Sequence, residues 1–344
     1  MHRKGFLSFI ASSAIASPLL SFIVAKENIP APFTIPPYLK TGDTIGITCP
    51  AGYISLEAIQ PAIKLMQGWG YRIKVGTTVG KRDFSFGGSD QERMEDMQQL
   101  IDDPQIKAIM CARGGYGAVR TVDLINFEKL KLHPKWIIGF SDITVIHSHL
   151  AANYQLASIH SKMCNSFPDD WSLADQVQME TILSIRNALS GQRMVYNTMP
   201  HAQNRKGTGN GILVGGNMKT LETLTGTRSD LNTRKCILFV EDTNENLYSI
   251  DRMFRHFKRS GKLSDLAGII IGGFKVKPDD PGEEFGRTIY DIVQEQVREF
   301  NYPLCFDFPV GHQKNNYALK CGVIHELNVS ADIVSLRELK TSSN

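Results

Sequence analysis

Residues 106–150 read IKAIMCARGGYGAVRTVDLINFEKLKLHPKWIIGFSDITVIHSHL, and this stretch decides the fold. The apolar run at 136–140 predicts a buried strand that ends at Ser141. The apolar residues after it have helical spacing, so a helix is predicted to begin at once, with Asp142 as its first residue. A strand, a serine and a helix in this order place a hydroxyl at the carboxyl edge of a sheet, facing the backbone N–H groups of the helix start.

A second apolar run, at 108–112, predicts a neighbouring strand that leads into the glycine-rich segment Arg113-Gly114-Gly115-Tyr116-Gly117. This loop can supply a second N–H donor to an oxyanion, so the two segments together indicate acyl transfer. Each segment also has a simpler interpretation. Serine is a preferred N-cap residue, a glycine cluster is common in tight turns, and Ile143 stands where the hydrolase elbow has glycine.

The composition excludes several classes of protein. The chain has 344 residues, 42% hydrophobic and 21% charged, which is enough for two globular domains with a core each. A net charge of +3 without a cluster of basic and aromatic residues argues against a nucleic-acid partner. There is no HExxH motif or paired Cys/His spacing, so we expect no metal and no cofactor. The six cysteines are scattered, several of them in apolar runs, and we expect buried free thiols.

The amino terminus resembles a secretory signal peptide. A basic start at Arg3 and Lys4 precedes an uncharged, apolar stretch at 5–25, with small-residue cleavage sites after Ala16 and Ala25. We therefore expect residues 1–25 to be removed and the protein to be exported, in a bacterium to the periplasm, without a stable membrane partner. An uncleaved membrane anchor and a cytoplasmic protein are the alternatives.

The order of predicted elements indicates an α/β fold. Strands and helices alternate over residues 36–165, which predicts an N-terminal Rossmann-like domain with a parallel sheet, carrying Ser141. A polar linker at 166–206 holds one helix, near 176–189, and residues 207–340 form a β-rich mixed domain. The predicted strands are 44–49, 71–75, 108–112, 136–140, 156–160, 211–214, 236–240, 268–271, 304–308 and 329–334. The predicted helices outside the linker include 56–69, 89–101 (opened by a capping box at Ser89), 250–258 and 284–300.

A serine nucleophile needs a base and a carboxylate that orients it. His312 follows a predicted strand and precedes a polar loop, so it can reach a cleft, and His160 at the end of another strand is the second candidate. Glu241 ends the apolar run 236–240 and either caps the next turn or projects into the cleft. The remaining candidates are weaker: a loop histidine at the surface, His133, and two on one helix that do not face the same way, His147 and His149.

Six ordered motifs resemble the LD-carboxypeptidase family of serine peptidases, over roughly residues 36–336. The motifs are GDTIGITCPAG, CARGGYGAVR, IIGFSDIT, GILVGGN, LFVEDTNENLYSIDRM and FPVGHQKNNYALKCG. The resemblance implies a triad of Ser141, Glu241 and His312 across two domains. It further implies an oxyanion hole at the backbone N–H groups of Asp142 and Gly115. Substrate contacts are expected for Asn217, in the Gly-Gly-Asn motif, and for the glycine-rich loop residues Arg113, Gly114 and Tyr116. The alternatives are that Asn217 supports the site and that Arg113 braces the loop. The implied reaction releases terminal D-Ala from a small peptide, a peptidoglycan tetrapeptide.

Two features depart from the family pattern. His160-Ser161-Lys162-Met163 stands where many members have His-Gly-Pro-Met, so the cleft wall is expected to differ there, and the leader puts a strictly cytoplasmic role in doubt. Two other functions stay open: a microcin-immunity type amidase and an exported protein that binds muropeptides without cutting them. The presence of serine, glutamate and histidine together argues against the binding protein. We also expect a homodimer.

Overall fold

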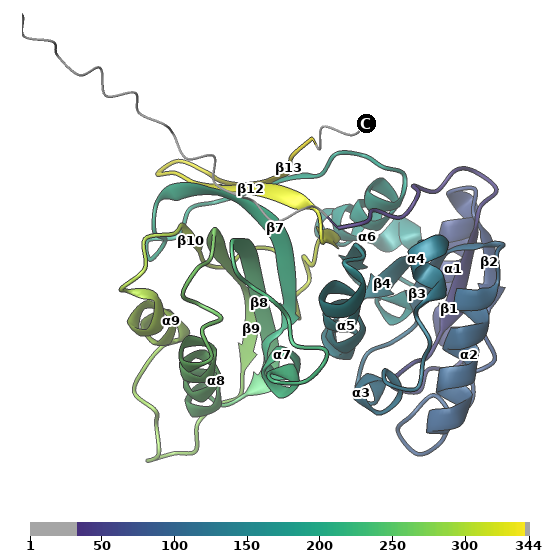
Figure 1. The fold of residues 1–344 in the computed structure, drawn as a ribbon, viewed down its shortest axis with the longest axis horizontal. Helices are drawn as coiled ribbons and strands as arrows, with labels where there is room; N and C mark the ends of the chain where they lie inside the picture. Colours follow the sequence, from purple (N-terminus) through teal and green to yellow (C-terminus); the bar gives the residue numbers. More distant parts are fainter. Residues whose placement is uncertain (1–32, 341–344) are drawn as a thin grey trace, which may run out of the picture.

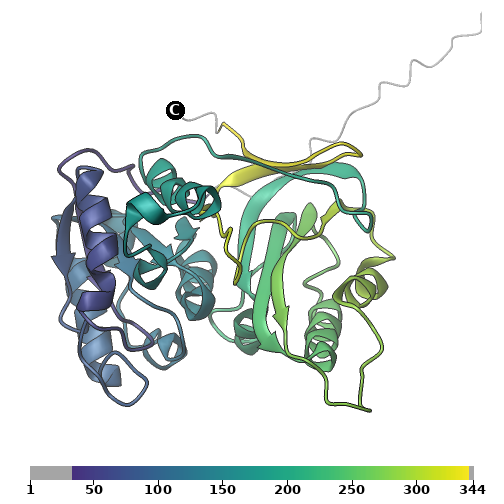
Figure 2. The ribbon, with the colours of Figure 1, turned by 180° about the vertical axis from the view of Figure 1, so that it is seen from behind.

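The computed structural model describes residues 33–340, so the expected signal peptide at 1–25 lies outside the described residues. Two sheets lie side by side, the first built mainly from the amino-terminal half and the second from the carboxyl-terminal half (Figures 1 and 2). Within the described range, none of the helices has the length and apolar character needed to cross a membrane.

The first sheet has six strands, five of them parallel. In spatial order they are β11 (Leu319–Cys321), β5 (Ser158–His160), β4 (Trp136–Gly139), β3 (Ile106–Cys111), β1 (Thr44–Thr48) and β2 (Arg72–Val75). The short apolar runs predicted as strands therefore pair in parallel, and the carboxyl ends of β3 and β4 meet at the same edge. That edge carries both the glycine-rich loop, which follows β3, and Ser141, which follows β4.

Helices cover both faces of the first sheet. One face packs against α1 and α6, the other against α2 to α5, as the grouping of buried side chains shows. The capping box predicted at Ser89 is confirmed, because Ser89 and Glu92 exchange both hydrogen bonds at the start of α2. The helices on this sheet are α1 (Gln60–Gly68), α2 (Asp90–Asp102), α3 (Ala118–Thr121), α4 (Lys129–Leu132), α5 (Thr144–Tyr154) and α6 (Gln176–Leu189), with 3₁₀ turns η1 (Glu57–Ile59), η2 (Ser141–Ile143), η3 (Cys164–Ser166) and η4 (Trp171–Leu173).

The second sheet has seven strands in mixed orientation. In spatial order they are β10 (Leu304–Cys305), β9 (Gly268–Val276), β8 (Cys236–Glu245), β7 (Gly207–Asn217), β12 (Ile324–Val329), β13 (Val334–Glu338) and β6 (Val195–Thr198). The first four are parallel and the other three antiparallel. Three helices pack on one face: α7 (Met218–Leu224), α8 (Leu247–Arg259) and α9 (Ile289–Val297). The expected α/β class, with a parallel sheet and a mixed β-rich part, is confirmed.

One hydrophobic core joins the two sheets. Along β8 the side chains alternate: Leu238 and Val240 pack with α7 to α9, while Ile237 and Phe239 face the opposite way. The second pair belongs to the same apolar cluster as α1, α6 and β4 of the first sheet. The two halves therefore share a continuous apolar core, which positions groups from both halves relative to one another.

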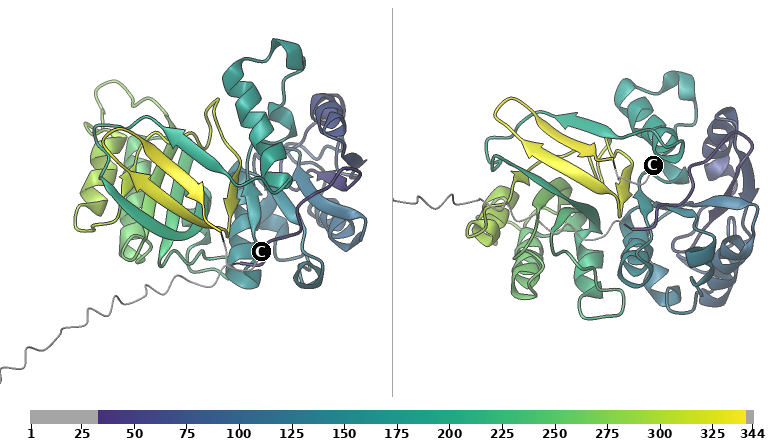
Figure 3. Two further views of the ribbon diagram at one scale, coloured as in Figure 1. Left: turned by 90° about the horizontal axis from the view of Figure 1, so that it is seen from above. Right: turned by 45° about the horizontal axis from the view of Figure 1, so that its top comes forward.

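The two sheets exchange strands in ways the sequence analysis did not anticipate. β11 comes from the carboxyl-terminal half but completes the first sheet, antiparallel to β5. β6 lies within the expected linker at 166–206, yet it pairs with β13 at the edge of the second sheet. The strand predicted at 329–334 is wrong, because Ser330 closes a tight turn between β12 and β13 with bonds to Asp332 and Ile333. Figure 3 shows that hairpin in yellow along the second sheet.

Candidate active site

Ser141 lies at the sharp turn between β4 and α5. Its backbone φ of 62° is left-handed, a conformation that costs a residue with a Cβ about 1–3 kcal/mol. Phe140 occupies the N-cap position of η2, and the Ser141 hydroxyl donates to no group within residues 33–340. The helix-cap interpretation of Ser141 is therefore not what the structure shows. A strained backbone that presents a hydroxyl free of partners is typical of a nucleophile turn.

The glycine-rich loop packs directly on this serine. A Cβ built on Gly114 would lie 3.0 Å from the Cβ and 3.3 Å from the Oγ of Ser141, so a larger residue would displace the hydroxyl. The Gly114 carbonyl accepts a hydrogen bond of 2.9 Å from the Gly52 N–H. Gly115 has a φ of 100°, and its N–H has no partner within the described part of the chain. An unpaired backbone N–H beside the serine is suited to an oxyanion.

Asp142 has a structural side chain. Its carboxylate is buried and accepts a hydrogen bond of 2.8 Å from the N–H of Ala118, where α3 begins after the glycine-rich loop. Burial raises the pKa of Asp142 to about 6. The side chain thus ties the start of η2 to the end of the loop, and only the backbone N–H of Asp142 is left for the expected oxyanion role.

Arg93, which was not among the residues expected from the sequence, supports the glycine-rich loop at Gly117. Its side chain is fully buried and forms an ion pair with Asp90. The guanidinium also donates to the carbonyls of Gly117 at 2.9 Å and Pro50 at 2.7 Å. One side chain therefore fixes both the glycine-rich loop and the Pro50–Gly52 segment that packs on it. Arg93 lies four residues before Met97 and seven before Leu100, so all three share the buried face of α2. This helical spacing could have identified Arg93 as buried from the sequence.

Glu241 and His312 form a buried hydrogen-bonded pair. Glu241 lies on β8, opposite Asn217 of β7, and is fully buried. One carboxylate oxygen accepts from Nδ1 of His312 at 2.5 Å and from the His312 backbone N–H at 3.2 Å. Gly311 permits this approach, since a Cβ there would clash with the Cβ of Glu241. The structure brings together these two candidates from the sequence, 71 positions apart.

The His312 ring lies next to the serine turn. Its centroid is 4.9 Å from that of Phe140, the residue that precedes Ser141. The side chain is 19% exposed, so the ring has access to a ligand, and Nε2 is the nitrogen that Glu241 does not use. No hydrogen bond joins Ser141 to His312 among the described residues, and such contacts often tighten only when substrate binds.

The other histidines are less suited to proton transfer. His160 is fully buried between the rings of Phe140 and Phe239, and burial holds its pKa well below the usual range. His147 is buried and bonded to the Gly139 carbonyl. His149 is buried and bonded to Ser229. Groups without access to solvent or substrate cannot deliver a proton to a cleft, so His312 is the better candidate for a base.

The expected substrate-binding residues differ in their surroundings. Asn217 is buried, caps α7 by accepting from the Thr220 N–H, and donates to Asp242 at 3.0 Å. Its amide is thus committed to the protein, which fits a supporting role. Arg113 is exposed and donates to the Tyr53 carbonyl at 2.8 Å, and Tyr116 is 56% exposed, so both can meet a ligand.

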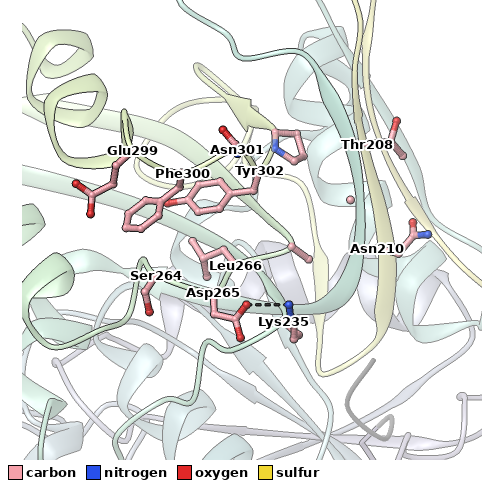
Figure 4. A pocket seen from close by; sticks show the side chains of 13 residues that line it. Thr208, Asn210, Lys235, Ser264, Asp265, Leu266, Glu299, Phe300, Asn301 and Tyr302 are labelled. Carbon is pink, nitrogen blue, oxygen red and sulfur yellow. Dashed lines mark ion pairs between the residues drawn. The ribbon is translucent and has the colours of Figure 1, made fainter. Parts of the chain in front are cut away.

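A pocket of about 430 Å³ elsewhere in the second half does not contain these residues. It lies at the amino ends of β7 to β9, where Lys235 and Asp265 form an ion pair of 2.8 Å (Figure 4). Glu241 and Asn217 lie toward the carboxyl ends of the same sheet, where α/β proteins bind ligands. In the described range, no group of three or more His, Cys, Asp or Glu side chains is arranged to hold a metal ion.

Comparisons with known proteins agree on one family. Residues 45–161 match the LD-carboxypeptidase N-terminal domain and residues 210–327 match the LD-carboxypeptidase C-terminal domain. The chain is 30% identical to a probable murein peptide carboxypeptidase of Bacillus subtilis, over 86% of this chain and 92% of that one. It is 24% identical to the microcin C7 self-immunity protein MccF of Escherichia coli, over 87% and 94%. A solved muramoyltetrapeptide carboxypeptidase of Oxalobacter formigenes superposes with a TM-score of 0.76 at 25% identity, covering 86% of this chain and 99% of that one.

Proposed function

The chain belongs to the LD-carboxypeptidase family and is a peptidase, and from this premise we propose that it cuts the L,D-peptide bond that releases terminal D-Ala from peptidoglycan tetrapeptides. We further propose that a triad of Ser141, His312 and Glu241 performs the reaction. The observation that carries the triad is the hydrogen bond between the buried Glu241 and His312, whose ring lies against Phe140 of the serine turn.

The chemistry follows from these positions. Nε2 of His312 takes the proton as Ser141 Oγ attacks the carbonyl carbon of the diamino acid, and Glu241 stabilises the imidazolium. The N–H groups of Gly115 and Asp142 donate to the oxyanion, and each such donor contributes roughly 10²–10³ in rate in comparable enzymes. When the tetrahedral adduct collapses, the C–N bond breaks and His312 gives its proton to the leaving amine of D-Ala. Water, deprotonated by the same histidine, then releases the peptide from Ser141.

Cleavage of defined peptides tests this function. The purified protein is incubated with tetrapeptides that end in D-Ala or L-Ala, with and without EDTA, and the products are weighed by mass spectrometry. We expect loss of D-Ala alone, unaffected by the chelator, because a site that pairs a terminal carboxylate in one geometry leaves its donors unpaired with the mirror image. Equal rates on both peptides would contradict the L,D-specificity. Inhibition by EDTA would contradict the serine mechanism, and Ser141→Ala serves as the inactive control.

The similarity to MccF supports a second candidate function. In this alternative the protein is an amidase that acts on a peptidyl-nucleotide analogue. The same triad would serve it, so the site alone does not separate the two. A competition assay does: with both compounds present, preferential release of the nucleotide product would favour the amidase. A protein that only binds muropeptides would cut neither compound.

We also propose that the protein is exported after removal of a leader and works as a homodimer. The support for export is the basic and apolar sequence at 1–25. Expressed in a bacterium, the mature chain should begin near Ser17 or Lys26 and lie in the periplasm. A soluble cytoplasmic product that still begins at Met1 would contradict export. Light scattering of the purified chain decides between monomer and dimer.

A further inference from the structure

Lys162 lies between the two chain segments that carry the candidate nucleophile and base. It lies two residues after the end of β5. Its ammonium donates a hydrogen bond of 2.6 Å to the carbonyl of Gln313, the residue after His312. It also lies 5.5 Å from the ring centroid of Phe140, the residue before Ser141. A positive charge is thus fixed at the centre of the site.

Among residues 33–340, this positive charge has no acidic side chain as its counter-ion. Within residues 33–340, Lys162 forms no ion pair, and one of its three N–H donors is used by Gln313. The carboxylate of Glu241, which favours the charged form of Lys162, is already bonded to His312. Burial lowers the pKa of Lys162 to about 8, and Lys275 adds to the shift while Glu241 opposes it. A partly buried cation without a counter-ion is costly unless a ligand supplies one.

Lys275 brings a second positive charge to the same place. It lies on β9, two residues beyond Gly273, whose N–H donates to the Val310 carbonyl at 2.8 Å. Gly273 also packs against the side chain of Gln313. Lys275 is exposed and forms no ion pair in the described part of the chain. The end of β9 therefore presents a cation toward the loop that Lys162 holds.

The substrate of a carboxypeptidase carries a negative charge close to the reacting bond. Its terminal carboxylate is separated from the attacked carbonyl carbon only by the amide nitrogen and one Cα, so a cation that binds it must lie next to the nucleophile and base. We propose that Lys162, assisted by Lys275, binds the terminal carboxylate of the peptide. This inference rests on the proposed function and assigns the contact to a residue outside the family motifs.

Binding to an inactive variant tests the assignment without relying on turnover. Calorimetry measures the affinity of Ser141→Ala for three tetrapeptides: one with a free terminal carboxylate, one with a terminal amide, and one in which only the side-chain carboxylate of a diaminopimelate is amidated. We expect the terminal amide to bind at least roughly tenfold more weakly, and the third peptide to bind like the first. In the double variant Ser141→Ala/Lys162→Gln the acid and the terminal amide should bind equally.

Two further variants separate recognition from support of the loop. Lys162→Arg keeps the charge and should retain a preference for the acid. Lys314→Gln changes an exposed lysine of the same loop, which pairs with Asp175, and should leave the preference unchanged. If Lys162→Gln weakens the acid and the amide equally, the lysine only holds the loop and the inference is wrong. The inference is also wrong if only the peptide with an amidated diaminopimelate side chain binds more weakly, or if none of the three peptides binds. Cleavage by Ser141→Ala would instead contradict the proposed triad.

Discussion

A single oxygen of Glu241 holds both the ring and the backbone of His312. The hydrogen bond to Nδ1 is 2.5 Å long and the one to the main-chain N–H is 3.2 Å. Because the carboxylate accepts at Nδ1, it fixes the tautomer in which Nε2 can accept a proton. The second bond fixes where the loop itself runs. The other carboxylate oxygen is buried without a partner among the described residues, so the pair has little tolerance for change.

Glu241→Gln should abolish most of the activity. The amide keeps the size of the side chain but can present N–H₂ to Nδ1, which favours the wrong tautomer. We expect kcat to fall by roughly 10³–10⁴-fold, as for the matching change in other triads. Turnover of the D-Ala tetrapeptide and a thermal melt check this. Near-normal turnover in a folded variant would show that Glu241 is structural.

Ser141→Ala and His312→Ala should each cost about as much as the two together. Members of a triad act as a unit, so removal of one disables the other. The comparison requires kcat for both single variants and the double variant on one peptide. If the fold-loss of kcat in the double variant equals the product of the two single losses, His312 acts independently of Ser141 and another base is used.

Arg93→Met should destabilise the protein far more than Arg120→Met. Both arginines contact Asp90, but Arg93 is fully buried whereas Arg120 is 46% exposed. Loss of Arg93 leaves the carbonyls of Gly88, Pro50 and Gly117 without their donor, whereas Asp90 keeps Arg120 as a partner. Each buried polar group left unpaired costs about 1–3 kcal/mol, whereas an exposed ion pair is worth about 1 kcal/mol or less. Urea unfolding of the two variants measures the difference. Similar midpoints would contradict the support that we assign to Arg93.

Gly114→Ala and Gly115→Ala should fail in different ways. The new methyl group of Gly114→Ala would meet Ser141 at 3.0 Å, so we expect kcat to fall while the melting temperature changes little. A displaced nucleophile typically costs about 10²-fold. Gly115 has a φ of 100°, so its alanine variant should lose roughly 1–2 kcal/mol of stability. Measurements of kcat and of the free energy of unfolding for both variants test this. Unchanged kcat in Gly114→Ala would contradict the idea that Gly114 keeps Ser141 in position.

Asp142→Asn should change how stability depends on pH. Burial raises the pKa of Asp142 in the folded state to about 6, so ionisation between pH 4 and 6 destabilises the wild type. Relative to the wild type, the variant should gain stability as the pH rises through this window, by at most about 3 kcal/mol. Asp175→Asn should shift the opposite way, because Lys314 lowers the pKa of that carboxyl. Urea midpoints at pH 4 and pH 7 measure both. The same sign for both variants would contradict the burial argument.

Much of the fold could be predicted because it depends on local patterns. The buried runs at 108–112 and 136–140 and the capping box at Ser89 act within a few residues, and each element formed where it was expected. The exchanged strands β6 and β11 could not be predicted in this way. Each has at most four residues, and its place is set by a partner far away in the sequence.

The candidate site, too, could be predicted only where a local sequence motif marks its residues. Ser141, Glu241 and His312 stand in motifs that can be recognised, whereas the sequence marks Arg93 only by its helical spacing from the apolar Met97 and Leu100. Its burial depends on carbonyls of two loops, at Pro50 and Gly117, that only the folded chain assembles around it. In the sequence, Lys162 was noted only as a departure from the family pattern. Its position beside His312 depends on a hydrogen bond to Gln313, 151 positions away, which the sequence does not predict.

The late position of β11 has a consequence for biosynthesis. While the chain is being made, β5 remains an open edge of the first sheet until Leu319–Cys321 has left the ribosome. An open edge invites pairing with other strands, so unfinished chains are exposed to aggregation. The same tail delivers His312 shortly before β11. A ribosome that stalls early therefore releases a chain that has the proposed nucleophile, Ser141, but lacks the proposed base, His312. Completion of the sheet thus coincides with completion of the proposed site.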